Sequence, residues 1–158
     1  MRFEQADVLA LPFGPDSFDA ITVLHVGMNI SDKRGLMRSL RRVLAPGGTV
    51  AVYDIMRVGD GDLSYPVPWA SGSASSHLST PDEYCDNMVA ADLAPAAPVD
   101  RLDVVRSALE RAANEPPPIN LSHLMGEGWP TMFANLRTAL DEGIVSPTQI
   151  IARRDAGS

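Results

Sequence analysis

Two apolar runs that flank one amphipathic segment constrain the fold of this chain most. Residues 20–26 read Ala-Ile-Thr-Val-Leu-His-Val, a largely apolar and β-branched run without alternation, and residues 49–55 form a second run of this kind. Such runs are typical of strands that are covered on both faces of a parallel sheet. We therefore expect residues 20–26 to form a central strand and residues 49–55 to form the next strand along the chain.

The segment between the two runs has the pattern of an amphipathic helix. Ser31 and Asp32 can cap its start, and Pro46-Gly47-Gly48 ends it. Its apolar side comprises Leu36, Met37, Leu40, Val43 and Leu44, and its basic side comprises Lys33, Arg34, Arg38, Arg41 and Arg42. Strand, helix and strand with short joints predict a βαβ unit, and hence an α/β fold with a parallel sheet.

The rest of the chain adds further elements to this unit. Residues 2–7 are a candidate edge or truncated strand, and residues 57–80 have the composition of a long irregular loop. We expect helices at residues 80–91, 100–113 and 131–142, and strands at 94–99 and 148–153. The last strand is expected to be antiparallel, at or near the sheet edge. The whole chain, residues 1–158, is expected to be one domain.

Composition and charge exclude several classes of function. The chain has 20 acidic and 13 basic residues and a formal net charge of -7, so we expect no nucleic-acid partner. We interpret the basic side of the first helix as a solvated face, with phosphate binding as the alternative. No apolar run reaches the roughly 18 residues of a membrane span and no signal peptide is recognisable, so we expect a cytoplasmic protein without a membrane partner.

Cysteine and histidine usage gives no indication of a metal. Cys85 is the single cysteine and cannot form an internal disulfide. The three histidines, His25, His77 and His123, are dispersed along the sequence rather than grouped at ligand spacing. We therefore expect no metal site.

Four short motifs occur in order and each fits its expected structural context. They are Asp7-Val8 at the end of a segment, Leu11-Pro12-Phe13 in a loop, Phe18-Asp19 before the first strand, and Arg42-Val43-Leu44-Ala45-Pro46-Gly47-Gly48 between helix and strand. In this order they resemble the second half of a class I S-adenosylmethionine-dependent methyltransferase domain. The resemblance is to methyltransferase type 11, akin to the enzymes of ubiquinone and menaquinone biosynthesis. It implies a Rossmann-like three-layer fold, mostly parallel with an antiparallel C-terminal strand.

The resemblance implies how the chain meets the cofactor, S-adenosyl-L-methionine. Asp7 is expected to accept a hydrogen bond from the adenine amino group, and Val8 to offer its backbone N–H and an apolar wall. Leu24 and His25, at the end of the first strand, are expected to contact the methionyl part. Without the resemblance, a loop or capping acid is the favoured interpretation of Asp7, and Asp19, before the strand, is interpreted as a residue of the fold.

The same resemblance implies the acceptor side of the site. Met28 and Asn29 follow the first strand, and Tyr65 and Trp69 lie on residues 57–80, the segment expected to cover the acceptor. The catalytic residue is not identified; His25 is a candidate base because histidine titrates near neutrality, but a histidine in an apolar strand is more often a hydrogen-bonded structural residue. Asn29 reads equally as a turn or cap residue. We expect methyl transfer to a small molecule.

The glycine-rich turn and ribose-binding acid that open a complete domain of this family have no counterpart ahead of Asp7. We therefore expect an N-terminally truncated domain, with weak or absent cofactor binding by the isolated chain. The alternative function is a non-catalytic remnant or interaction module. It would use an exposed sheet edge, through which the chain could also form homo-oligomers.

Overall fold

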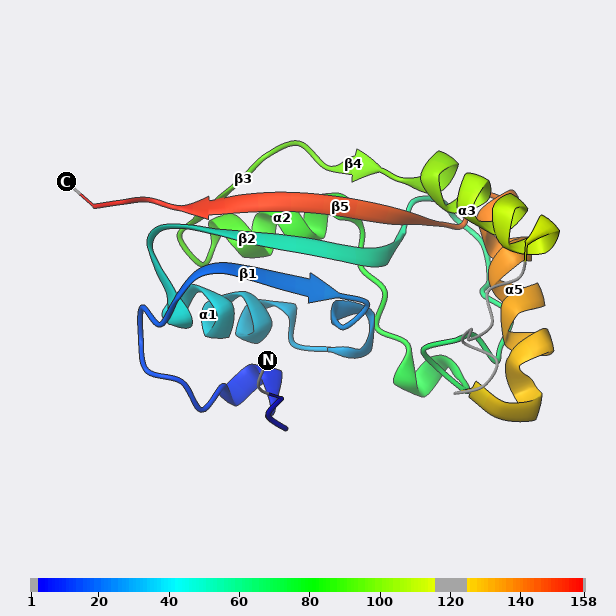
Figure 1. The fold of residues 1–158 in the computed structure, drawn as a ribbon, viewed down its shortest axis with the longest axis horizontal. Coiled ribbons are helices and arrows are strands. Elements are labelled where there is room, and N and C mark those ends of the chain that lie inside the picture. Colours follow the sequence, from blue (N-terminus) through cyan, green and yellow to red (C-terminus); the bar gives the residue numbers. More distant parts are fainter. Residues whose placement is uncertain (1–2, 116–124, 158) are drawn as a thin grey trace.

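The computed structural model describes residues 3–115 and 125–157, and it has an open α/β fold (Figure 1). The strands of its sheet are β1 (Phe18–Leu24), β2 (Leu44–Arg57), β3 (Leu93–Pro95), β4 (Val99–Asp100) and β5 (Val145–Arg154). The α-helices are α1 (Lys33–Val43), α2 (Pro81–Val89), α3 (Leu102–Asn114) and α5 (Trp129–Asp141). Short 3₁₀ turns occur at η1 (Val8–Ala10), η2 (Gly27–Asn29), η3 (Ser73–Ser75) and η4 (Gly126–Gly128).

The predicted βαβ unit is present. β1 and β2 are parallel and α1 connects them, while β5 runs antiparallel to β2 as expected of the last strand. β3 and β4 also pair antiparallel with β5, so the part of the sheet that the structure describes is mixed rather than mostly parallel. The Gly47 backbone has φ of +77°, and here β2 bulges against the start of β1, which explains why the Pro-Gly-Gly segment lies within a strand.

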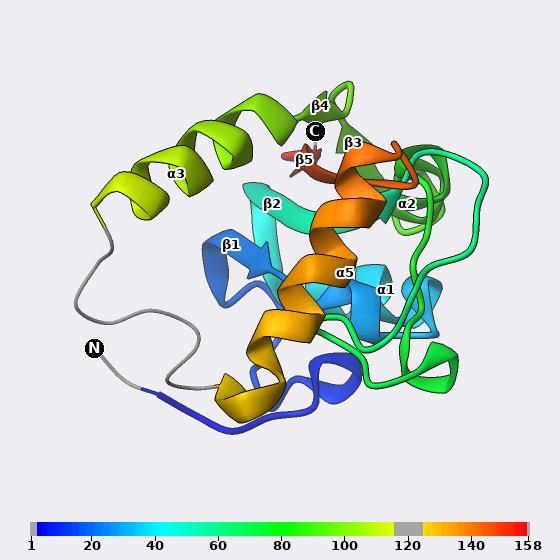
Figure 2. The same cartoon turned by 90° about the vertical axis from the view of Figure 1, so that its right-hand side faces the viewer.

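One face of the sheet carries the main core. Alternate side chains of β2 are fully buried there, including Val50, Val52 and Met56, because successive strand residues point to opposite faces. α1 and α2 cover this face, as Figure 2 shows from the end of the sheet. Leu36, Met37 and Leu40 of α1 and Met88 of α2 belong to the same cluster. Their pattern is the helical spacing seen in the sequence.

β1 is an edge strand, so the prediction of a central strand for residues 20–26 was wrong for the part of the chain described. Among residues 3–115 and 125–157 it pairs only with β2. Val23 is buried under α1, whereas Ala20, Thr22 and Leu24 on the other face are exposed. A sequence rich in β-branched residues predicts the strand, but its position in the sheet depends on neighbours that the run itself does not specify.

Residues 57–80 are packed rather than loosely exposed. Leu63, Val67 and Ala70 are buried in a second core with Leu140 of α5 and Val145 of β5. Asn135 of α5 donates a side-chain hydrogen bond to Pro66 O at 2.9 Å. This second core fixes the segment beside the end of the sheet toward which β1 points, where α3 and α5 also lie (Figure 1).

Two further sequence predictions differ from the structure. Residues 3–7 form no strand. The single strand expected at 94–99 is divided into β3 and β4, with Pro98 between them. Proline has no amide donor for a ladder, which accounts for the break.

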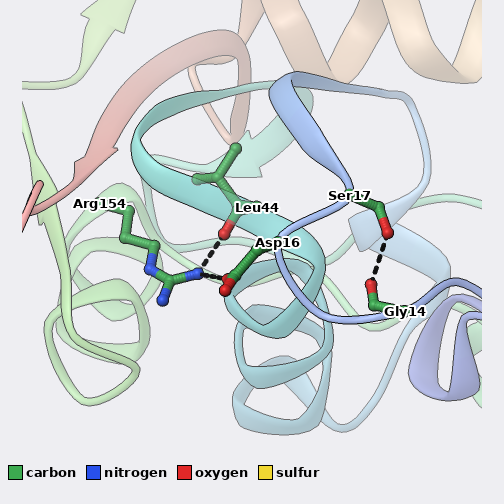
Figure 3. Close-up of polar contacts among 5 residues, drawn as sticks. All are labelled: Gly14, Asp16, Ser17, Leu44 and Arg154. Atoms are coloured by element: carbon green, nitrogen blue, oxygen red, sulfur yellow. Dashed lines mark hydrogen bonds and ion pairs between the residues drawn. The ribbon is translucent and has the colours of Figure 1, made fainter.

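The loop before β1 is tied to the body of the protein by two arginines. Arg154 of β5 forms an ion pair with Asp16 and donates to Leu44 O, as Figure 3 shows, and Ser17 Oγ donates to Gly14 O at 2.7 Å. Arg42 donates to the carbonyls of Leu11 and Phe13, each at 2.6 Å. Arg42 therefore holds the Leu-Pro-Phe loop instead of lying free on a solvated face. No helix in the described part of the chain is long and apolar enough to cross a membrane.

Candidate functional site

The carboxyl end of β1 turns sharply at His25. This residue has φ of +53°, a left-handed conformation that is uncommon for a residue other than glycine. Its backbone N–H donates to Tyr53 O at 2.9 Å, and the chain then enters the η2 turn. The resemblance places cofactor and acceptor contacts at this turn. We call residues 25–30 the β1-end loop.

A buried carboxylate lies beneath the β1-end loop. Asp54 of β2 is fully buried, and its Oδ1 accepts the Val26 N–H at 2.9 Å. Its Oδ2 accepts the Gly27 N–H at 3.0 Å and the Tyr84 hydroxyl at 2.9 Å. Three donors from two other elements therefore converge on one carboxylate, which fixes the loop backbone relative to β2 and α2.

Glycine is required at position 27 by this close approach. A β-carbon on Gly27 would collide with Asp54 Oδ2 and with the Tyr84 hydroxyl. Sequence reasoning did not single out Asp54, Gly27 or Tyr84. The available signal was an aspartate in the middle of an otherwise apolar strand, where an acid is expected only with buried partners.

The electrostatics of this cluster follow from burial. Burial raises the pKa of Asp54, while the hydrogen bonds from Tyr84, Val26 and Gly27 and the nearby His25 act in the opposite direction. Burial also raises the pKa of Tyr84, and the adjacent carboxylate adds to this effect. The Tyr84 phenol therefore stays protonated and remains a hydrogen-bond donor.

Lys33 holds the other end of the β1-end loop. Its Nζ donates to Ile30 O at 2.6 Å and also to His77 O, and it lies 5.6 Å from the centre of the Tyr84 ring. Only 7% of Lys33 is exposed, so its assignment to the solvated basic side of the helix was wrong. Burial lowers the pKa of Lys33, and the charges of Asp54 and Glu83 oppose that effect.

The predicted acceptor residues meet around the same loop. Asn29 Nδ2 donates to Trp69 O at 2.6 Å, and the Trp69 indole donates to Ser76 Oγ at 3.0 Å. Tyr65 is half-buried against the second core. Met28 is only 3% exposed, so its side chain belongs to that core rather than to an open surface. The structure thus brings Asn29 together with Trp69, and the acceptor role of all four residues stays a prediction.

The predicted adenine-side residues lie at η1. Asp7 Oδ1 accepts the Leu9 N–H at 2.9 Å, which is the capping role considered as its alternative. Val8 is half-buried and, with Leu11, Phe13 and Ile21, lines an apolar hollow of about 340 Å³ along β1. Asp7 itself is exposed. Its role toward a cofactor stays a prediction.

The His25 ring is exposed and packs edge-to-face on Tyr53, with 5.1 Å between the ring centres. Leu24, the other predicted methionyl contact, is 60% exposed. No group of three or more His, Cys, Asp or Glu residues in the described ranges is arranged to hold a metal ion. His123 lies outside those ranges.

Comparisons with known proteins find similar sequences and similar folds. The family model described as "Methyltransferase domain" matches residues 1–52, which include β1 and α1. The demethylmenaquinone methyltransferase of Thermus thermophilus is 44% identical over 54 residues, 34% of this chain and 24% of that protein. The ubiquinone/menaquinone biosynthesis C-methyltransferase UbiE of Idiomarina loihiensis is 40% identical over 57 residues, 36% of this chain and 23% of that protein.

Solved structures match nearly the whole chain. The [4+2]-cyclase SpnF aligns over 98% of this chain and 56% of its own, with a TM-score of 0.68 and 19% identity. Geranyl diphosphate C-methyltransferase from Streptomyces coelicolor aligns over 96% of this chain and 51% of its own, with a TM-score of 0.68 and 17% identity. At these identities the likeness shows the fold. The findings support a class I methyltransferase domain.

The curated relatives and the solved structures differ in how much of their own length this chain covers. The chain spans about a quarter of the length of the curated relatives it matches, and about half of the solved chains. One solved geranyl diphosphate methyltransferase is a complex with S-adenosylmethionine.

Proposed function

We propose that this chain forms the acceptor side of a cleft in which a methyl group passes from S-adenosylmethionine to a small molecule. The observation that carries the proposal is the β1-end loop, whose backbone is held by Asp54 directly after a strand of the matched segment. Open α/β sheets bind ligands beyond the carboxyl ends of their strands, which is where this loop lies. A rigid loop at this place positions an acceptor, and positioning supplies much of the rate enhancement in group transfer.

The residues near η1 are suited to the adenine end of the cofactor. No described residue other than Leu9 donates a hydrogen bond to Asp7, so its Oδ2 is available to an exocyclic amine. Val8 borders an apolar hollow in which a flat base can pack. Asp7 would thus cap η1 with one oxygen and select the adenine amino group with the other.

His25 is the base in this proposal. When bound, S-adenosylmethionine supplies a methyl group on a positively charged sulfur. The His25 imidazole, exposed at the loop, would take the proton that the acceptor atom loses as its new bond to carbon forms. The acceptor atom gains the methyl group, the carbon–sulfur bond breaks, and the sulfur keeps its electron pair.

Binding and transfer are tested separately. Calorimetry measures the affinity of the chain for S-adenosylmethionine. Methyl transfer should be assayed with labelled cofactor, on the chain alone and on the chain extended by any in-frame coding segment upstream of Met1. Asp7→Ser retains a capping oxygen but removes the carboxylate, so it should weaken cofactor binding, whereas Asp19→Asn, at the opposite end of β1, should not. Equal affinities for the two variants would count against the role of Asp7.

A second function is favoured by the open edge of β1. Among the described residues this strand pairs only with β2, and such an edge can accept a strand from a second copy of the chain. Sedimentation analysis should then show a dimer that Thr22→Lys, a charge on the edge strand, converts to monomer. A monomer at all concentrations, together with methyl transfer, would favour catalysis over this module.

A further inference from the structure

A row of four side chains crosses the sheet on the face opposite α1 and α2; in order they are His25, Tyr53, Gln149 and Arg101. Tyr53 of β2 and Gln149 of β5 are register partners. The His25 ring lies against Tyr53 with 5.1 Å between the ring centres. Arg101, which follows β4, donates Nε and Nη2 to Gln149 Oε1 at 2.9 and 2.7 Å. Tyr53 precedes Asp54, which points to the α2 side, so the row lies on the other face.

The row has donors that no described residue uses. Arg101 engages Gln149 through two of its nitrogen atoms, and its Nη1 has no hydrogen-bond partner in residues 3–115 and 125–157. Within the same ranges the Tyr53 hydroxyl also has no hydrogen-bond partner, and the His25 ring is exposed. Tyr53, Gln149 and Arg101 are each only half-buried, so these groups are accessible to a ligand.

The row is positive on an acidic protein. Acids outnumber bases by 20 to 13 in the chain, yet none of the four side chains is a carboxylate. Arg101 is close enough to act on Tyr53: burial raises the pKa of this phenol, and the guanidinium charge opposes the rise. A planar guanidinium with a free nitrogen suits the oxygens of a carboxylate or phosphate.

Apolar side chains border the row on the same face. Leu24 is the register partner of Tyr53, and Val99 is the partner of Gln149. Ile151 lies two residues from Gln149 along β5 and therefore points the same way. These three side chains are 60%, 43% and 41% exposed respectively. The face thus combines an oxyanion-binding group with an apolar surface.

We propose that Arg101 and Tyr53 bind the oxyanion of a small acid with an apolar body, which lies on Leu24, Val99 and Ile151. Resting on the proposed function, this assigns the methyl acceptor to the class of small organic acids. The acidic group anchors at Arg101, on the far side of Tyr53 from His25. The acceptor atom then lies toward the β1-end loop.

The test is a titration of the chain with benzoate, followed by heteronuclear NMR. No cofactor is present. Benzoate should shift resonances of the row, and its neutral analogue benzamide should bind at least about tenfold more weakly, which equals about 1.4 kcal/mol. Phenyl phosphate, run in parallel, distinguishes a phosphate site from a carboxylate site. Arg101→Gln should weaken benzoate binding at least about tenfold.

Arg153→Gln is the matched control, because Arg153 is an exposed arginine on the same face of β5. It should leave benzoate affinity within about twofold. Equal losses for the two arginine variants would indicate diffuse charge and would overturn the proposal. So would equal binding of benzamide and benzoate, or no binding at tens of millimolar benzoate.

Arg101 also attaches the start of α3 to β5, so a variant that removes its charge has to be checked for folding. Tyr53→Phe removes only a hydroxyl that has no hydrogen-bond partner among the described residues, so it should keep stability while weakening benzoate binding severalfold. Unchanged affinity in Tyr53→Phe would remove the phenol from the site and overturn the assignment. Selective benzoate binding, with no methyl transfer either by the chain alone or by the chain extended upstream of Met1, would count against the proposed function alone.

Discussion

Asp54 Oδ2 accepts the Gly27 N–H at 3.0 Å in a space that a β-carbon on Gly27 would fill. This contact joins the C-terminal part of β2 to the turn after β1, two segments separated by α1. The turn is also where His25 adopts its left-handed backbone. The geometry of the candidate site therefore depends on one buried carboxylate and one glycine.

Gly27→Ala is expected to destabilise the fold by about 1–3 kcal/mol, because the added methyl group overpacks the space between Asp54 and Tyr84. Chemical denaturation measures this loss. Gly14→Ala is the matched control, since its β-carbon would meet only Ser17 Oγ at 3.6 Å, and it should change stability by less than about 0.5 kcal/mol. Equal stability of Gly27→Ala and wild type would contradict the close packing of the loop on Asp54.

Tyr84→Phe is expected to cost about 1.5–3 kcal/mol, because it removes one donor from a buried carboxylate and leaves the ring in place. The free energy of unfolding at pH 7 measures the cost. Tyr65→Phe serves as the control: Tyr65 is half-exposed, and no described residue forms a hydrogen bond with its hydroxyl. A cost for Tyr65→Phe as large as that for Tyr84→Phe would show that the loss is not specific to Asp54.

Local patterns in the sequence were enough to predict much of the fold. The apolar runs of β1 and β2, the helical spacing of Leu36, Met37 and Leu40, and the antiparallel last strand are confirmed. Each depends on periodicity within one segment or on the order of neighbouring segments. The four motifs also predicted the family that the comparisons support.

The interior of the candidate site was not predictable in the same way. Asp54 contacts the β1-end loop and α2, which are distant from it in the sequence. Lys33 is buried, although Arg34 and Arg38 of the same helix are exposed. The helical periodicity of the sequence placed Lys33 on the same side of α1 as those arginines. Periodicity does not show that the carbonyls of Ile30 and His77 lie where they accept hydrogen bonds from a buried amine. The edge position of β1 likewise depends on pairing partners, which a strand's own residues do not determine.

The titration of Asp54 should make the free energy of unfolding depend on pH. Burial raises its pKa in the folded state, so the folded protein binds more protons than the unfolded chain between the two pKa values. The contribution of Asp54 to stability is therefore greatest at low pH and decreases as pH rises from about 4 to the raised pKa. Lys33, Tyr84 and His25 are the charged or titratable groups around it.

Asp54→Asn should abolish this component, so the stability difference between wild type and Asp54→Asn should change with pH over that window. Unfolding midpoints measured from pH 4 to pH 8 test this, with Asp19→Asn as a control that alters an exposed acid. At neutral pH Asp54→Asn is expected to be less stable by about 1–3 kcal/mol, because its amide group faces backbone donors. Parallel pH curves for wild type and Asp54→Asn would contradict the raised pKa.

Lys33 should control how firmly residues 57–80 are held against the β1-end loop. Its amine bonds the carbonyls of Ile30 and His77, so Lys33→Met keeps the apolar stem but leaves both acceptors unsatisfied. We expect a loss of about 2–4 kcal/mol in unfolding free energy and faster proteolysis within residues 57–80. Arg34→Met, at the next, exposed position, should change both measurements little. If cleavage within residues 57–80 were equally slow in Lys33→Met and wild type, the segment would have to be held by its apolar core alone.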